Sequence, residues 1–340
     1  MTKQFIELVL RRASELYGFD ARIAEEGPGH EGGRNIIYIV RSADGIKAVL
    51  RVSPLPDRTE TDYLAETEFV HYLACHGAPV TDVIPSKNHC LVERCELDGQ
   101  TAYLCMFEYA EGMLICDNGY RYREGHPLEE YFFNTGKTLG MIHRLAKQYV
   151  PQHPRMSYKE KYNRAYIDKL IPVRYEALKA SIFERLEQFD ALPVGPEAFG
   201  MVHFDFSDGN YHIDMTNGRI TVFDFDNCMN CWYMFDLANL WTHGEGWCRG
   251  ITGADERMAY MTHYFDTVLA GYRTETDVPD ALLAQLPLFI DMVLVENIVD
   301  EFECCARNGE LPEDEDIEDE AECLIDHIPY AGICMEQKND

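Results

Sequence analysis

The spacing of apolar residues divides the chain into two parts of different character. The first part, up to about residue 110, opens with a helical stripe over residues 4–17 and continues with short apolar runs of the kind found in β-strands. A second helical stripe, from Tyr63 to Leu73, separates these runs and is closed by Gly77. The strand-like runs are Ile36–Val40, Ala48–Val52, Cys90–Glu93 and Thr101–Tyr109. This part is therefore expected to form a small antiparallel sheet with helices against it.

From about residue 113 onward, apolar residues recur mainly at helical spacing. Nine of the residues from Glu310 to Glu322 are Asp or Glu, and because an apolar stripe continues through them, we expect these charges to form a solvated outer face. The predicted helices lie within 128–145, one or two within 157–190, one from about 232, and then Met258–Tyr272, Leu282–Arg307 and Glu313–Ile328. The two parts together predict an α+β protein.

A polar loop at residues 203–210 is followed by a predicted hairpin whose turn is Asn217-Gly218. Such a hairpin would bring Asp205 and Asn210 beside Asp224 at its far end. Two carboxylates 4 Å apart repel by roughly 4 kcal/mol at an effective dielectric of 20, so the cluster needs a cation. An all-oxygen ligand set of this kind suits Mg²⁺. The simpler alternative is a polar loop beside a hairpin, with Asp and Asn present as turn formers.

The pattern His203-x-Asp205-x-x-x-x-Asn210, with Asp224 after the next hairpin, resembles the catalytic and metal loops of the aminoglycoside phosphotransferase and choline kinase-like family. That family shares the protein-kinase fold. The resemblance implies a bilobal fold with a nucleotide-binding N-lobe at residues 1–110 and a catalytic and substrate-binding C-lobe at 111–340. It also implies that Asp205 is the catalytic base, that Asn210 and Asp224 hold Mg²⁺, and that Asp226 is a further candidate ligand.

Two residues of the catalytic loop depart from the family pattern. Phe204 stands where the family often has Gly, and Asp208 where it often has Pro. Neither change removes a functional group, so both bear on the shape of the loop.

The same resemblance places candidate nucleotide-binding residues in the N-lobe. Arg51 stands on the strand that carries a phosphate-binding cation in kinase-like folds, and Glu66 stands where the family has the acid that pairs with it. Taken singly, either residue could equally be a surface charge. A glycine-containing loop that includes Gly33 and Asn35 can lay backbone N–H groups over phosphates. The segment from Glu108 to Ala110 matches the family's hinge, which would meet the nucleotide base.

Three other sequence features are expected to be structural. The Leu-Gly-x-x-His signature of the family is matched by residues 139–143, and His143 is expected to be a packed histidine. Asp236 resembles the family Asp that braces the catalytic loop from beneath. Cys228-x-x-Cys231 is half of a zinc pattern, but no second pair stands at a suitable spacing.

Composition and charge limit the kinds of partner. The 340 residues are 46% hydrophobic and 26% charged, which is typical of a globular protein. No apolar stretch is long enough for a membrane span, no signal-peptide core is visible, and the twelve scattered cysteines suggest reduced thiols, so a cytoplasmic protein is expected. A net charge of −29 argues against nucleic acid or an anionic membrane as partner. The charge favours a neutral or cationic substrate, and the acidic residues expected near the acceptor are Asp236, Glu245, Asp255 and Glu256.

The expected reaction is Mg²⁺-dependent transfer of the γ-phosphate of ATP or GTP to a hydroxyl of a small molecule. Aminoglycosides, homoserine, choline, ethanolamine and other small alcohols or amino sugars all fit the motifs, and a role in antibiotic resistance is not implied. Two alternatives remain open at this stage: a nucleotide-binding pseudokinase that acts as a scaffold, and a protein Ser/Thr kinase of the same fold. The sequence assigns no oligomeric state.

Overall fold

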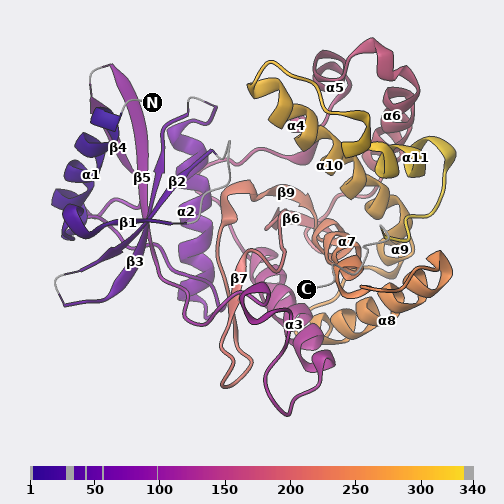
Figure 1. Ribbon diagram of the computed structural model, residues 1–340, viewed down its shortest axis with the longest axis horizontal. Coiled ribbons are helices and arrows are strands. Elements are labelled where there is room, and N and C mark those ends of the chain that lie inside the picture. The colour runs from indigo at the N-terminus through magenta and orange to yellow at the C-terminus, as the bar shows by residue number, and fades with distance from the viewer. Residues whose placement is uncertain (1–2, 28–33, 43, 56, 98, 333–340) are drawn as a thin grey trace.

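The first part of the chain forms a five-stranded antiparallel sheet with one helix on each face (Figure 1). The computed structural model describes residues 3–27, 34–42, 44–55, 57–97 and 99–332. The sheet order is β1-β2-β3-β5-β4. The strands are β1 (Glu25–Glu26), β2 (Ile36–Arg41), β3 (Lys47–Ser53), β4 (Glu93–Leu97) and β5 (Gln100–Glu108). The helices are α1 (Lys3–Tyr17) and α2 (Glu60–Cys75).

The two helices of this lobe have different roles. Helix α1 packs its apolar stripe on the outer face of the sheet, where Phe5, Val9 and Ala13 share one core with Leu50 and Leu104. Helix α2 lies on the inner face, between the sheet and the rest of the molecule (Figure 1). Its apolar residues Phe69, Val70 and Leu73 belong to the large core of the second lobe. Helix α2 is therefore the element that joins the two lobes.

The second lobe is mainly helical. Helices α3 and α8 pack closely side by side and run in the same direction, since Phe132 contacts Tyr264 and Arg144 contacts Glu275. A Cβ on Gly140 would lie 2.6 Å from the carbonyl oxygen of Tyr272, so only glycine permits this approach. The helices are α3 (Leu128–Ala146), α4 (Tyr158–Lys161), α5 (Arg164–Leu170), α6 (Glu176–Asp190), α7 (Tyr233–His243), α8 (Ala254–Tyr272), α9 (Asp280–Leu283), α10 (Leu286–Arg307) and α11 (Glu318–Asp326).

Two short antiparallel ladders hold the polar loops of the second lobe. Strand β6 (Phe199–Val202) pairs with β9 (Met229–Trp232), and β7 (Tyr211–Ile213) pairs with β8 (Ile220–Val222). The β7–β8 hairpin turns at Gly218, which has a φ of 77° and lies against the Tyr122 side chain, so a larger residue there would be both strained and crowded. The predicted hairpin is confirmed, and with it the predicted two-lobe α+β fold. The division at residue 110 stays a prediction.

Four predicted elements differ from the structure, one of them the helix expected over Leu282–Arg307, which is divided into α9 and α10. Residues 90–92 follow a turn at 87–88 as irregular backbone and a bend, the Ser86 N–H donates to the Cys90 carbonyl oxygen at 2.9 Å, and β4 begins only at Glu93, which pairs with Leu104. The region 157–190 forms three helices and not one or two, because Tyr162 and Pro172 stand at breaks between them. At the C-terminal end Leu324 is buried but Ile328 is exposed, so the apolar stripe is shorter than predicted. Within the described residues no helix is both long and apolar enough to cross a membrane.

Candidate active site

The loop between β6 and β7 is anchored from below by one buried carboxylate. Asp236, at the start of α7, accepts hydrogen bonds from the backbone N–H groups of His203 and Phe204, both at 2.9 Å. His143 lies 3.0 Å from the same carboxylate and is completely buried. These contacts confirm that Asp236 braces the loop and that His143 is a packed, structural residue.

Phe204 adopts a conformation that favours glycine, at the position where the family often has one. Its φ is 73°, in the left-handed region that costs a large side chain of order 1–3 kcal/mol. Two interactions offset this strain. Asp236 accepts the Phe204 N–H, and the Phe204 ring stacks on Phe235 with a centroid distance of 4.5 Å and an angle of 2°. Packing therefore replaces glycine in holding the loop that carries Asp205.

Asp205 is a half-buried carboxylate whose ionisation is suppressed. Burial, and secondly the negative charge of Asp224, raise the pKa of Asp205 to about 7. Asn210 donates a 2.9 Å hydrogen bond from its carboxamide to the Asp205 carbonyl oxygen, and the Phe223 N–H donates to the Asn210 carbonyl oxygen at 2.9 Å. These bonds tie the end of the loop to the end of β8. The structure thus brings Asp205, Asn210 and Asp224 together as the sequence predicted, although their catalytic and metal-binding roles stay predictions.

Asp224 follows β8 in a left-handed conformation, with φ 61° and ψ 60°. Loss of hydration around its carboxylate and the negative charge of Asp226 raise the pKa of Asp224 to about 6. The residue nevertheless remains exposed, and contact with solvent screens both effects. Its carboxylate therefore lies at the edge of the protein interior. Two neighbouring acids that both resist ionisation form a site that a hard divalent cation would stabilise, and the carboxylate and carboxamide oxygens fit Mg²⁺.

The carboxylate of Asp226 forms ion pairs with arginines. Arg34 donates to its carboxylate at 3.0 Å, Arg58 forms a short ion pair with it, and Asn35 donates to it at 3.1 Å. Burial alone would raise the pKa of Asp226, but the charges of Arg58, Arg51 and Arg34 outweigh it and hold the pKa below its ordinary value. Because these partners already neutralise the carboxylate, the expectation that Asp226 also holds a metal ion gains no support from its contacts.

Arg51 and Glu66 form the ion pair expected from the sequence. Both Nη atoms of Arg51 donate to the two carboxylate oxygens of Glu66, each at 2.7 Å. The side chains are 3% and 0% exposed, so the pair is fully inside the protein between β3 and α2. Both Nη atoms of Arg51 are engaged by Glu66, and its binding of phosphate stays a prediction.

The arginines around Asp226 were not recognised in the sequence, apart from Arg51. Burial and the positive charges of Arg155 and Arg34 lower the pKa of Arg58, although Asp226 acts in the opposite direction. Arg155 is committed to backbone carbonyl oxygens of Asp62, Asp226 and Cys228. Among these arginines Arg58 is the one whose positive charge is least well compensated, since Arg34 also pairs with Asp57 and Arg51 with Glu66. The sequence signal that could have identified this cluster is the position of two arginines: Arg58 stands just before α2, and Arg34 stands just after the glycine-containing loop.

The other predicted nucleotide contacts lie in two places. Gly33 is outside the described residues. Asn35 is held between Asp226 and Ser53, whose hydroxyl donates to the side-chain amide oxygen Oδ1 of Asn35 at 2.6 Å. The N–H of Glu108 donates to the Asp82 carbonyl oxygen at 2.8 Å, and His212 lies 2.7 Å from the carbonyl oxygen of Ala110. The contact of Glu108 and Ala110 with a nucleotide base stays a prediction.

Acidic side chains of α10 approach the catalytic loop from the other side. Burial and the neighbouring charges of Asp300 and Asp205 raise the pKa of Glu296 to about 8, against the opposing charge of Lys161. The charge of Asp300 also contributes to the raised pKa of Asp205. These two acids lie 40 and 44 residues beyond Glu256, the last residue that the sequence suggested for the acidic wall, and nothing in their helical spacing distinguished them from surface charges.

Of the acids that the sequence suggested for that wall, two are used elsewhere. Asp236 lies beneath the loop, and Glu245 accepts a short hydrogen bond from Tyr330. The expectation that they face the acceptor is therefore not supported by their contacts.

The two-lobe fold, the braced loop and the paired carboxylates define a phosphotransferase of the kinase-like class. A family model described as "Phosphotransferase enzyme family" matches residues 28–276. The chain belongs to this family, and it is a small-molecule kinase.

Particular relatives agree with this assignment. Amicoumacin kinase of Bacillus subtilis (strain 168) is 24% identical over 287 residues, which cover 84% of this chain and 81% of the relative. The solved structure of amicoumacin kinase hAmiN, in complex with AMP-PNP, Ca²⁺ and the ligand abbreviated Ami, has a TM-score of 0.82 at 22% identity and covers 98% of this chain and 96% of its own. A microcompartment-associated aminopropanol kinase has a TM-score of 0.69 at 16% identity, covering 95% and 99%.

Proposed function

We propose that this kinase transfers the γ-phosphate of ATP, bound with Mg²⁺, to a hydroxyl of a small, amine-bearing acceptor. The observation that carries the proposal is the pair of carboxylates Asp205 and Asp224, which the braced loop and the β7–β8 hairpin bring close enough for the charge of Asp224 to act on Asp205, and which both have raised pKa values. Their mutual repulsion is relieved when a cation and its phosphates occupy the space beside them.

Asp205 acts in this proposal as the base. Its carboxylate accepts the proton of the acceptor hydroxyl while the hydroxyl oxygen forms a bond to the γ-phosphorus, and the bond to the β–γ bridging oxygen breaks to release ADP. A pKa near 7 suits a base that works near neutral pH. Asn210 and Asp224 would hold Mg²⁺, which when bound neutralises charge on the phosphates.

We further propose that Arg58 and Arg34 contact the phosphates. Both lie beside Asp226 at the junction of the lobes, and the lowered pKa of Arg58 indicates that a further negative charge there would be favourable. Arg51, by contrast, is 3% exposed and bidentate with Glu66, so its part is mainly to fix α2 against the sheet. Binding of nucleotide would then draw Arg58 from Asp226 to phosphate.

The acidic residues of α10 favour a cationic acceptor. Glu296 and Asp300 share one electrostatic environment with Asp205, and burial and these like charges keep Glu296 protonated until about pH 8. An acceptor ammonium group would lower the cost of ionising them, whereas a carboxylate or phosphate acceptor would add to it. The preference for a cationic acceptor is thus proposed from charges on α10, a helix that carries none of the kinase motifs.

The test is a screen of nucleoside-diphosphate release over matched pairs of hydroxyl compounds. Each pair consists of an amino alcohol or amino sugar and its uncharged or carboxylated counterpart, and amicoumacin is included because a relative is named for it. Asp205→Asn protein serves as the blank for release that does not depend on the proposed base. Turnover confined to amine-bearing members supports the proposal. A preferred acceptor with net negative charge contradicts the acceptor class, and equal release by the blank contradicts the role of Asp205.

A further inference from the structure

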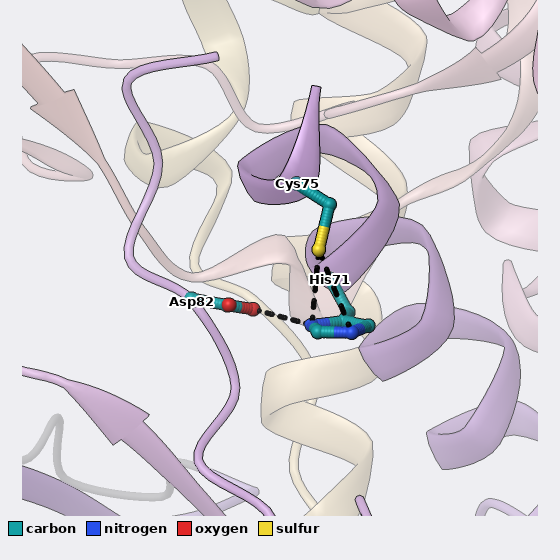
Figure 2. A group of neighbouring side chains, drawn as sticks. All are labelled: His71, Cys75 and Asp82. Carbon is teal, nitrogen blue, oxygen red and sulfur yellow. Dashed lines mark hydrogen bonds and ion pairs between the residues drawn. The ribbon is translucent and has the colours of Figure 1, made fainter. Parts of the chain in front are cut away.

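A second cluster of metal-type ligands lies on the far end of α2, away from the catalytic loop. Figure 2 shows His71 and Cys75 on one side of the helix and Asp82 pointing toward them from the segment that follows. The possible ligand atoms of these three side chains all lie within 4.8 Å of one another, and among the described residues they are the one group of three or more His, Cys, Asp or Glu side chains that does so. The active-site carboxylates do not approach one another so closely as a set of three.

The positions of the three side chains suit a tetrahedral metal ion. His71 Nδ1 lies 2.9 Å from Asp82 Oδ1, and Cys75 Sγ lies 3.9 Å from the same nitrogen. Ligands at the usual Zn²⁺ distances of about 2.0–2.3 Å are about 3.4–3.6 Å apart around a tetrahedral centre. The nitrogen–oxygen separation is about 0.5 Å shorter than that value and the nitrogen–sulfur separation about 0.3 Å longer, differences that a small rotation of partly exposed side chains can supply, and all three ligand atoms lie within 4.8 Å of one another.

We propose that His71, Cys75 and Asp82 form a Zn²⁺ site with water in the fourth position. Helical residues four apart, such as His71 and Cys75, project from the same face, the spacing that metal-binding helices use for two ligands. A set of one imidazole, one thiolate and one carboxylate selects a borderline transition metal over Mg²⁺, which requires oxygen ligands. Cys75 is exposed and the His71 side chain is 44% exposed, so an ion can enter from solvent.

The third ligand is held in place by the backbone around it. Val83 donates its N–H to Asp82 Oδ1 at 2.7 Å, and the Asp82 N–H donates to the Glu108 carboxylate at 3.3 Å. The Asp82 carbonyl oxygen in turn accepts the Glu108 N–H at the end of β5. Metal ligands are commonly fixed by such outer hydrogen bonds, which orient the donor atom before the ion arrives.

Occupation of the site would join three parts of the kinase. The segment around Asp82 bridges β5 through Val83 and Phe107, and β8 through Val80 and Val222. Helix α2 supplies the other two ligands and also carries Glu66. Bound Zn²⁺ would therefore tie α2 to the end of β5 and to the hairpin that precedes Asp224, and we expect it to raise the thermal stability of the whole protein.

The test uses the full-length, untagged protein, freed of metal and kept reduced. Zn²⁺ affinity is measured in competition with a chromogenic chelator, and Co²⁺ is used as a spectroscopic probe, because a thiolate ligand adds a charge-transfer band that an all-oxygen site cannot produce. The variants are Cys75→Ser, His71→Gln and Asp82→Asn. Cys90→Ser is the matched control at another exposed cysteine, and Asp224→Ala removes the proposed Mg²⁺ site.

Wild type, Cys90→Ser and Asp224→Ala are expected to bind one equivalent of Zn²⁺ with the thiolate band. Cys75→Ser should lose the band, and the other two ligand variants should bind Zn²⁺ at least tenfold more weakly. Binding that is unchanged in all three ligand variants, or a wild-type Co²⁺ complex without the thiolate band, would overturn the proposal. Circular dichroism identifies any variant that does not fold, and the remaining two ligand variants then decide.

Discussion

Replacement of Glu66 by Gln is expected to destabilise the protein by about 3–5 kcal/mol, because it leaves the buried guanidinium of Arg51 without its counter-charge. Both carboxylate oxygens of Glu66 accept from Arg51 at 2.7 Å, and the two side chains are 0% and 3% exposed. The next carboxylate, that of Asp226, is 3.9 Å from Arg51 and is already paired with Arg58. No nearby group can therefore take over the role of Glu66.

The magnitude is large relative to the whole stability of a folded protein, which is about 5–15 kcal/mol. The free energy of unfolding is measured by urea titration, followed by circular dichroism and by tryptophan fluorescence, and is compared only where the two transitions coincide. Glu60→Gln, an exposed acid in the first turn of the same helix, is the control and should change stability by less than about 1 kcal/mol.

A double variant separates stability from function. Replacing the pair by apolar residues, Arg51→Met with Glu66→Leu, should restore most of the lost stability, since buried ion pairs are often matched by well-packed hydrophobic residues. Nucleotide affinity should recover together with stability, because the part of Arg51 is mainly to fix α2 against the sheet and Arg58 remains beside Asp226. A Glu66→Gln variant within 1 kcal/mol of wild type would refute the reasoning, since it would mean that the buried charge of Arg51 finds another partner or water.

Three further predictions concern the reaction. Asp205 must be ionised to act as a base and its pKa is raised to about 7, so kcat/KM should fall as pH drops below 7. The apparent pKa of this profile should fall as free Mg²⁺ rises and screens Asp224. A kcat/KM profile that is flat from about pH 5.5 to 8 would contradict this. Arg58→Gln should weaken ATP binding by about 1–2 orders of magnitude, the loss expected for a charge-assisted hydrogen bond of roughly 1.5–3 kcal/mol, and should change the acceptor KM little. Calorimetric titration with ATP measures this, and an unchanged ATP affinity would exclude Arg58 from the phosphate site. Glu296→Gln should raise KM for an amine-bearing acceptor and leave KM for its uncharged counterpart nearly unchanged; equal effects on both would indicate a structural role.

Local sequence signals were sufficient for most of the fold and for the core of the site. The Asn217-Gly218 turn fixes the β7–β8 hairpin because glycine adopts the φ of 77° there without strain, and this hairpin sets Asp224 beside the loop that carries Asp205. The pairing of Arg51 with Glu66 was accessible because strand and helix follow one another in the chain. Features that depend on neighbours in sequence were thus predictable.

Features that depend on distant residues were not. Arg34 and Asp226 are 192 positions apart, and Arg58 and Asp226 are 168 apart, so no local pattern links them. The same reason applies to Glu296 and Asp300, whose effect on Asp205 arises only when α10 packs under the catalytic loop. In the sequence they look like ordinary charges on an amphipathic helix, and the acids chosen from the region after Asp226 were chosen only for their position in the chain.

The reaction proposed for this kinase depends on Asp224, which with Asn210 is proposed to hold the metal ion of a bound nucleotide. Calorimetric titration of ATP with and without Mg²⁺ tests it directly and needs no knowledge of the acceptor. Wild type and Asp205→Asn are predicted to show tighter ATP binding when Mg²⁺ is present, because both keep the metal ligands. Asp224→Ala should lose this dependence on Mg²⁺ entirely. If Asp224→Ala binds ATP with the same affinity as wild type and the same response to Mg²⁺, the metal is held elsewhere and the account of the site is contradicted.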